Sequence, residues 1–186
     1  MLFNSLEFVV VFLPVVLAIF AFLQGRESRK YFIIFASMVF YAWWDPRFII
    51  LLTASIAGNY IVSLIISRTQ GQARKASLAA GLALNLGLLG YFKYADFLIE
   101  NFARIFGVEP ALLGIALPLA ISFFTFQQIA FLIDQYSAPR HDVRMVDYVF
   151  FVAFFPQLMA GPIERAGKLL PQIEHPRKIQ ASHIRE

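Results

Sequence analysis

The stretch FIILLTASIAGNYIVSLIIS, residues 48–67, contains no charged side chain. A helix of about 20 apolar residues is long enough to cross the roughly 30 Å hydrocarbon core of a bilayer. Working outward, residues 8–24, 76–92 and 111–133 are similar uncharged stretches, and residues 31–44 form a shorter one. Polar backbone groups cannot remain unpaired in lipid, so these stretches predict helices. We therefore expect an all-α, polytopic membrane protein with about five transmembrane helices.

The composition supports this interpretation and excludes other classes. The chain is 59% hydrophobic and 15% charged, whereas soluble domains are about one quarter charged. It contains no cysteine, which excludes disulfides, thiolate metal sites and cysteine nucleophiles. The net charge is +4, but the basic residues are spread through short loops. We therefore attribute them to membrane topology and expect no nucleic-acid partner.

Loop charges predict the orientation, because cytoplasmic loops are enriched in Lys and Arg. Three loops hold most of the basic residues before position 145, namely Arg26, Arg29 and Lys30; Arg68, Arg74 and Lys75; and Arg140 and Arg144. These loops fall on one side, which we assign to the cytoplasm, and Met1 is then extracytoplasmic. Residues 164–186 are also strongly basic and predict a cytoplasmic segment.

The uncharged residues 148–163 are short for a membrane span and contain Pro156 and the pair Gly161-Pro162. A complete crossing would place the basic residues 164–186 outside, against the charge rule. Proline also interrupts helices. We therefore predict a re-entrant segment that returns to the cytoplasmic side and is covered by a cavity, with an ordinary kinked helix as the alternative.

Two other patterns predict helix placement. Residues 97–106 are too short and too charged to cross a membrane, and Glu100 and Arg104 are four residues apart, so we expect an amphipathic helix in the outer interface. Small residues form a stripe on residues 76–92, at Ala79, Ala83, Gly87 and Gly90. Such stripes permit close helix contact.

Polar side chains recur in the stretch 111–133. Ser122, Thr125 and Gln128 share one helix face, while Gln127 and Asp134 share another. Polar groups at this depth face the bundle interior or a wet pathway, so interhelical hydrogen bonding and a substrate channel both remain open. Asn59 and Asn85 have no companions in the pattern, and we interpret them as hydrogen-bonding residues between helices.

No catalytic or metal-binding constellation is evident in the sequence. His141 lies in a polar loop, and His175 and His183 lie in the basic segment near the end. All three have the setting of solvated histidines, and the spacing of the last two does not fit a zinc site. We expect no metal.

Four blocks of the chain resemble the membrane-bound O-acyltransferase family. They are YAWWDPRFIILLTASIAGNYIV (41–62), GYFKYADFLIENF (90–102), LPLAISFFTFQQIAFLIDQY (117–136) and FFPQLMAGPIERAGKLLPQ (154–172). Together the four blocks cover essentially the whole chain, in the order in which the family has them. The resemblance is strongest to the bacterial branch that contains the alginate O-acetyltransferase membrane subunit.

The resemblance implies an enzyme that passes an acyl group, in this branch an acetyl group, from a cytoplasmic donor to a polysaccharide or cell-wall glycan hydroxyl outside. It implies a bacterial inner-membrane location, no tightly bound cofactor, acetyl-CoA or another acyl carrier as substrate, and an extracytoplasmic glycan acceptor or a periplasmic acetyltransferase as partner. The matching blocks supply the tunnel or substrate-path candidates, which are Ser122, Thr125, Phe126, Gln127, Asp134, Gln157, Gly161, Pro162 and Arg165.

Members of the family are more than twice as long as this chain, and their catalytic histidine lies in a later helical region. We therefore expect residues 1–186 to form one helical unit, the N-terminal part of a longer domain, with the catalytic histidine beyond Glu186 and no transferase activity alone. The alternatives are a non-catalytic membrane scaffold and a transporter subunit. The sequence shows neither a repeat nor a buried charge pair, which weighs against a transporter.

Overall fold

A computed structural model describes residues 5–139 and 143–160, and every element in these ranges is helical. The elements in chain order are a π-helical turn Phe8–Phe12, α1 (Leu13–Phe22), α2 (Arg26–Ala42), α3 (Arg47–Arg68), α4 (Gly71–Leu89), a second π-helical turn Gly90–Tyr94, α5 (Ala95–Phe106), α6 (Ile121–Ser137), α7 (Met145–Ala153) and α8 (Phe155–Ala160). The all-α prediction is confirmed for these residues.

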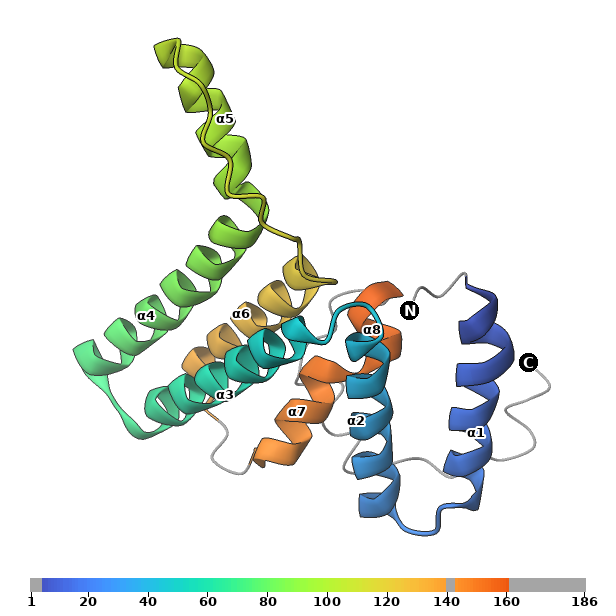
Figure 1. The fold of residues 1–186 in the computed structure, drawn as a ribbon. Coiled ribbons are helices and arrows are strands. Elements are labelled where there is room, and N and C mark those ends of the chain that lie inside the picture. Colours follow the sequence, from blue (N-terminus) through green and yellow to red (C-terminus); the bar gives the residue numbers. More distant parts are fainter. Residues whose placement is uncertain (1–4, 140–142, 161–186) are drawn as a thin grey trace, which may run out of the picture.

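The helices form two groups that meet at α7 and α8. Helices α3, α4 and α6 pack against one another, while α1 packs beside α2 (Figure 1). Helix α7 contacts α2, α3 and α6, and α8 contacts α2 and α6. The main core lies around α7 and includes Tyr148, Phe151 and Phe131. A smaller core holds α1, α2 and α8 together through Phe8, Phe40 and Phe155.

The outer faces of these helices are strongly apolar. Ile50 is 74% exposed on α3, Leu84 is 55% exposed on α4 and Val15 is 50% exposed on α1. Apolar surface of this extent is unusual for a soluble monomer. Two helical segments, Arg47–Arg68 and Gly71–Phe106, are long and apolar enough to cross a membrane, and Phe8–Phe22 is a shorter apolar helix. The fold therefore fits a helical membrane protein, while the number of spans stays a prediction.

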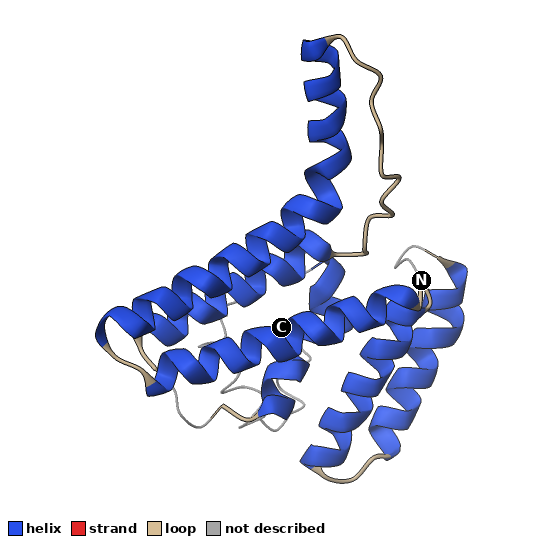
Figure 2. Cartoon of the chain, turned by 60° about the vertical axis from the view of Figure 1, so that its left-hand side comes forward, coloured by secondary structure: helices blue, strands red, loops and turns tan. Residues whose placement is uncertain are grey.

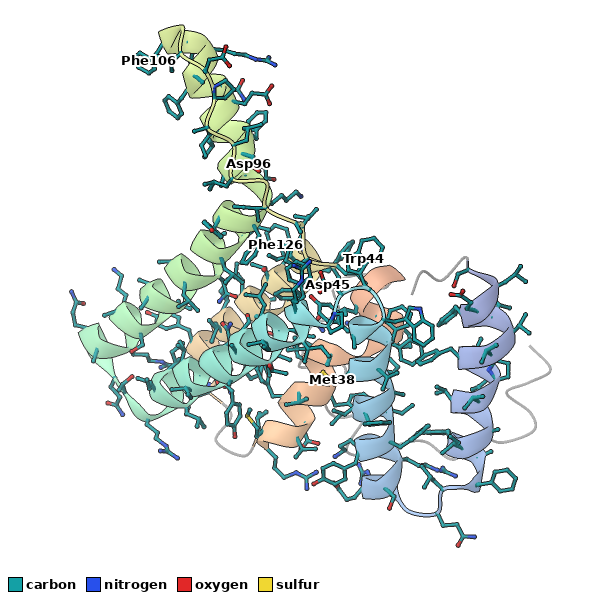
Figure 3. The ribbon with its side chains drawn as sticks, viewed as in Figure 1. Met38, Trp44, Asp45, Asp96, Phe106 and Phe126 are labelled. Atoms are coloured by element: carbon teal, nitrogen blue, oxygen red, sulfur yellow. The ribbon has the colours of Figure 1, made fainter. Side chains whose placement is uncertain are left out.

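Helices α4 and α5 form one helical segment that bends at the π-helical turn Gly90–Tyr94 (Figure 1). A π-helical turn is one of the established causes of helix kinks. The predicted amphipathic helix over residues 97–106 is confirmed as part of α5, and Arg104 contacts Glu100 at 2.6 Å. Its position in the membrane interface stays a prediction. Figure 3 places Asp96 near the start of α5 and Phe106 at its far end.

Residues 111–120 differ from the prediction, because the helix expected over 111–133 begins only at Ile121. The preceding chain runs back alongside α5 (Figure 2). Gly107 and Gly114 have φ of 66° and 62°, values that favour glycine, and Pro118 cannot donate a helical hydrogen bond. The Asp96 carboxylate accepts hydrogen bonds from the amides of Leu113 and Ile115, at 2.7 and 3.2 Å. The Asp96 side chain thus satisfies the amides of Leu113 and Ile115 in place of helical hydrogen bonds.

The small-residue stripe on α4 does not pack against another described helix. A side chain added at Gly87 or Gly90 would meet nothing within 4 Å, so these residues make no close helix contact among the described parts. The packed face of α4 instead carries the buried residues Gly81, Asn85 and Leu89. Gly81 permits the close approach, because a Cβ there would lie 2.7 Å from Leu132 and 2.9 Å from Val62.

Candidate functional site

The break between α7 and α8 is the centre of the candidate site. In a continuous helix the amide of Phe155 would donate to the carbonyl of Phe151, but Phe154 has an extended ψ of 107° and ends α7. The two freed groups are captured separately. Gln127 Nε2 on α6 donates to the Phe151 carbonyl at 2.7 Å, and the Phe155 amide donates to Ser37 Oγ on α2 at 3.2 Å.

Pro156 explains the position of this break. It has no amide hydrogen, and its ring would clash with the carbonyl four residues earlier if α7 continued. At the second residue of α8 it lies in a first turn, where amides have no intrahelical partner in any case. The predicted interruption of residues 148–163 is thus confirmed at Pro156. Gly161, Pro162 and Arg165 lie outside the described residues, as do His141, His175 and His183, and the re-entrant path stays a prediction.

The predicted residues of α6 separate into two environments. Thr125 and Gln127 are 0% and 4% exposed, so the expected interior location is confirmed for both. Ser122 is half-buried and accepts a hydrogen bond from Lys93 at 3.2 Å. Phe126 is 44% exposed. Asp134 is half-buried, one helical turn before the end of α6.

Interhelical hydrogen bonding explains part of the buried polar set. Gln128 Nε2 donates to Ser55 Oγ on α3 at 3.2 Å. Asn59 and Asn85 exchange hydrogen bonds between α3 and α4 at 3.2 and 2.6 Å. The hydrogen-bonding role predicted for Asn59 and Asn85 is confirmed. Their partner, which the sequence pattern did not indicate, is each other's side chain.

Four other side chains have buried polar atoms without a hydrogen-bond partner among the described residues. The atoms are Arg74 Nε, Thr125 Oγ1, the Tyr148 hydroxyl and both amide atoms of Gln157. Buried polar atoms are nearly always satisfied by protein or by ordered water. Hydroxyl and amide groups in this state suit water or the oxygen atoms of a substrate. The amide atoms of Gln157, one of the path candidates, are buried.

A charged cluster, which the sequence pattern did not indicate, joins the starts of α2 and α7. Lys30 contacts Asp147 at 2.5 Å, and both side chains are at most 3% exposed. Arg144 bridges Asp147 at 2.8 Å and Glu27 at 3.0 Å. The Arg144 hydrogen bond is the main cause that holds the pKa of Glu27 below its ordinary value. Lys30 was counted as a loop cation, yet it forms the buried charge pair that the sequence did not reveal.

The described residues contain no group of three or more His, Asp and Glu side chains arranged to hold a metal. The candidate site therefore consists of a broken helix, two side chains that hold backbone groups at the break, and buried polar atoms on α6, α7 and α8. Such an arrangement can hold a rigid non-helical turn inside an apolar bundle and offer hydrogen bonds there.

No family model and no solved structure matches the chain. The chain is 39% identical to the peptidoglycan O-acetyltransferase of Helicobacter pylori, an alignment that covers 94% of this chain and 39% of that protein. It is 38% identical to the probable alginate O-acetylase AlgI of Pseudomonas aeruginosa, over 94% of this chain and 35% of that protein. The chain is also 40% identical to the probable alginate O-acetylase AlgI of Azotobacter vinelandii, over 94% of this chain and 36% of that protein.

The chain thus spans between about a third and two fifths of the length of the curated relatives that it matches. Similarity at this level over nearly the whole chain confirms the family resemblance. The chain is a partial-length homologue of bacterial peptidoglycan and alginate O-acetylases, the proteins on which the resemblance to the membrane-bound O-acyltransferase family rests.

Proposed function

We propose that this chain forms part of a bacterial inner-membrane O-acetyltransferase that passes an acetyl group across the membrane to a glycan hydroxyl. The observation that carries the proposal is the similarity, over 94% of the chain, to proteins named as peptidoglycan and alginate O-acetylases. Acetyl-CoA or another acyl carrier supplies the acetyl group. An extracytoplasmic polysaccharide, or a periplasmic acetyltransferase that completes the transfer, receives it.

In this proposal the broken helix forms a wall of the substrate path. Gln127 and Ser37 hold the free backbone groups of the break in place. Thr125, Tyr148 and Gln157 supply the unpartnered polar atoms that hydrogen-bond to the passing acyl donor or to water. Ser122, Phe126, Asp134, Gly161, Pro162 and Arg165 remain path candidates from the resemblance. The general base is a histidine outside this chain.

The proposal predicts that the 186-residue chain alone transfers no acetyl group above background. If an acetyl donor and a glycan gave turnover with this chain, and His141→Ala abolished it, the loop histidine would be catalytic and the assignment of the base would be wrong.

A chimera tests the proposed path directly. This chain would replace the matching segment of the H. pylori peptidoglycan O-acetyltransferase, and peptidoglycan acetylation would be measured in cells. We expect the chimera to be active, and Thr125→Val and Gln157→Leu to lower acetylation at least about tenfold at equal membrane abundance, the scale of losing a transition-state hydrogen bond. Ser77→Ala, which removes an exposed hydroxyl bonded within its own helix, is the control. An active chimera that is insensitive to both path variants would exclude this path.

One observation favours the transporter alternative. The sequence pattern weighed against a transporter because it showed no buried charge pair. The structure contains such a pair, Lys30–Asp147. Membrane-buried ionisable residues often mark ion or proton pathways. Here, however, each charge has a partner, and the network joins two helix ends, which supports a structural role.

A further inference from the structure

A cavity of about 660 Å³ lies between α1, α2 and the α7–α8 break. Its walls are apolar side chains, which include Val16, Leu17 and Phe20 of α1 and Phe150 and Phe154 beside the break. A volume of this size is within the range of protein pockets that hold small ligands. The apolar walls select hydrocarbon rather than a polar solute.

One end of the cavity is basic. Arg26, Arg29 and Lys30 line it, and no acidic residue does. Lys30 is neutralised by Asp147. Arg29 stacks its guanidinium 4.9 Å from the centre of the Phe20 ring and donates through Nε to the Leu23 carbonyl at 2.9 Å. It forms no ion pair with a carboxylate in the described parts of the chain. Its charge is therefore held at the cavity mouth and remains available to an anion.

An apolar chamber with a fixed cation at one end matches an amphiphile that has acyl chains and an anionic headgroup. Helix α1 also exposes Val15 and Ile19, which do not line the cavity, at 50% and 40%, so its outer side presents apolar surface to the bilayer. The predicted orientation places Arg26 and Arg29 at the cytoplasmic leaflet, where anionic lipids concentrate. We propose that this cavity binds the acyl chains of an anionic phospholipid, with the lipid phosphate at Arg29.

Lipid competition tests the proposal without any acetyl-transfer readout, so its failure is distinguishable from failure of the proposed function. The purified 186-residue chain would be equilibrated in detergent with equal amounts of phosphatidylglycerol and phosphatidylcholine, and bound lipid measured by native mass spectrometry. We expect one retained phosphatidylglycerol in preference to phosphatidylcholine. Arg29→Gln should weaken its binding about fivefold, the effect of one basic group near anionic lipid.

Two further variants complete the test. Leu17→Trp fills the cavity and should abolish retention of the lipid, which keeps the test decisive if Arg29→Gln fails to fold. Arg68→Gln removes an exposed basic residue at the end of α3 that does not line the cavity, and should change nothing. Equal retention of both lipids, equal effects of Arg29→Gln and Arg68→Gln, or undiminished binding in Leu17→Trp would each overturn the proposal. Displacement of the lipid by acetyl-CoA would assign the cavity to a soluble donor instead and also overturn it.

Discussion

Gln127 and Ser37 capture the Phe151 carbonyl and the Phe155 amide, which would bond to each other if α7 continued past its break with α8. Both partners come from other helices, and both bonds are buried. A buried backbone group without a partner costs about 1–3 kcal/mol. These two side chains therefore make the break compatible with an apolar interior.

Removing both side chains tests this role. We expect Gln127→Leu with Ser37→Ala to lower the free energy of unfolding by about 2–6 kcal/mol, because two buried groups lose their partners. Unfolding in mixed detergent micelles, with hydrogen exchange at the Phe155 amide, measures the effect. The matched control is Thr53→Val, whose exposed hydroxyl bonds within its own helix. Unchanged exchange at Phe155 would show that the break is held by packing alone.

The pair Lys30–Asp147 makes a second prediction at this scale. Asp147→Ala should destabilise the fold by about 3–5 kcal/mol, because it leaves Lys30 buried with only the half-exposed Glu27, 3.4 Å away, as its carboxylate partner. The double variant Lys30→Met with Asp147→Leu should recover most of this loss, because apolar residues of similar volume replace a buried ion pair at little cost.

The exposed pair Arg47–Asp45 provides the comparison, since the Arg47 side chain is 81% exposed and such pairs contribute at most about 1 kcal/mol. Arg47→Ala should therefore be nearly neutral in the same unfolding measurement.

A double variant at Lys30 and Asp147 that is as unstable as Asp147→Ala would point instead to a requirement for charge at this position.

At the scale of elements, the contact between α4 and its neighbours depends on Gly81 rather than on the predicted stripe. The stripe and the buried face lie on roughly opposite sides of α4. Periodicity alone identified a face of small residues, but which face packs depends on where α3 and α6 lie. That information is not contained in the sequence of α4.

Two glycine variants of α4 distinguish these faces. Gly81→Val should destabilise the fold by about 1–3 kcal/mol, because the new side chain overlaps Leu132 and Val62. Gly87→Val should be neutral or slightly stabilising, because nothing lies within 4 Å of the added Cβ and glycine is a poor helix former. Thermal unfolding in detergent measures both, and equal losses would place Gly87 against another part of the protein.

At the scale of the whole molecule, contacts bring together the loops that the charge rule assigns to one side. Arg74 at the start of α4 donates to the carbonyls of Gln135 and Tyr136 near the end of α6. Arg144 before α7 bridges Glu27 near the start of α2. Toward the other ends of the helices, the Tyr41 hydroxyl donates to the Leu119 carbonyl at 3.1 Å. The arrangement is consistent with the predicted orientation and does not test it.

Cysteine labelling provides that test. Single cysteines at Ser28, Gln70 and Ser137 lie at exposed positions and should remain unlabelled by an impermeant thiol reagent in intact cells. A periplasmic reporter fused after Glu109 should be active, and one fused after Gln180 silent. Labelling at all three cysteines would reverse the orientation, and activity after Gln180 would mean that residues 148–163 cross the membrane completely.

The sequence by itself determined the helical membrane character, the amphipathic residues of α5 and the interruption near Pro156, because each follows from composition or from the chemistry of adjacent residues. The interior location of Thr125 and Gln127 followed from the same cost of exposing polar groups to lipid. Only the tertiary structure showed that residues 111–120 lie outside the helix, that Asn59 pairs with Asn85, and that Lys30 is buried against Asp147. These pairings join residues 26 and 117 positions apart. Local patterns carry no information on which distant groups become neighbours, so packing alone decided them.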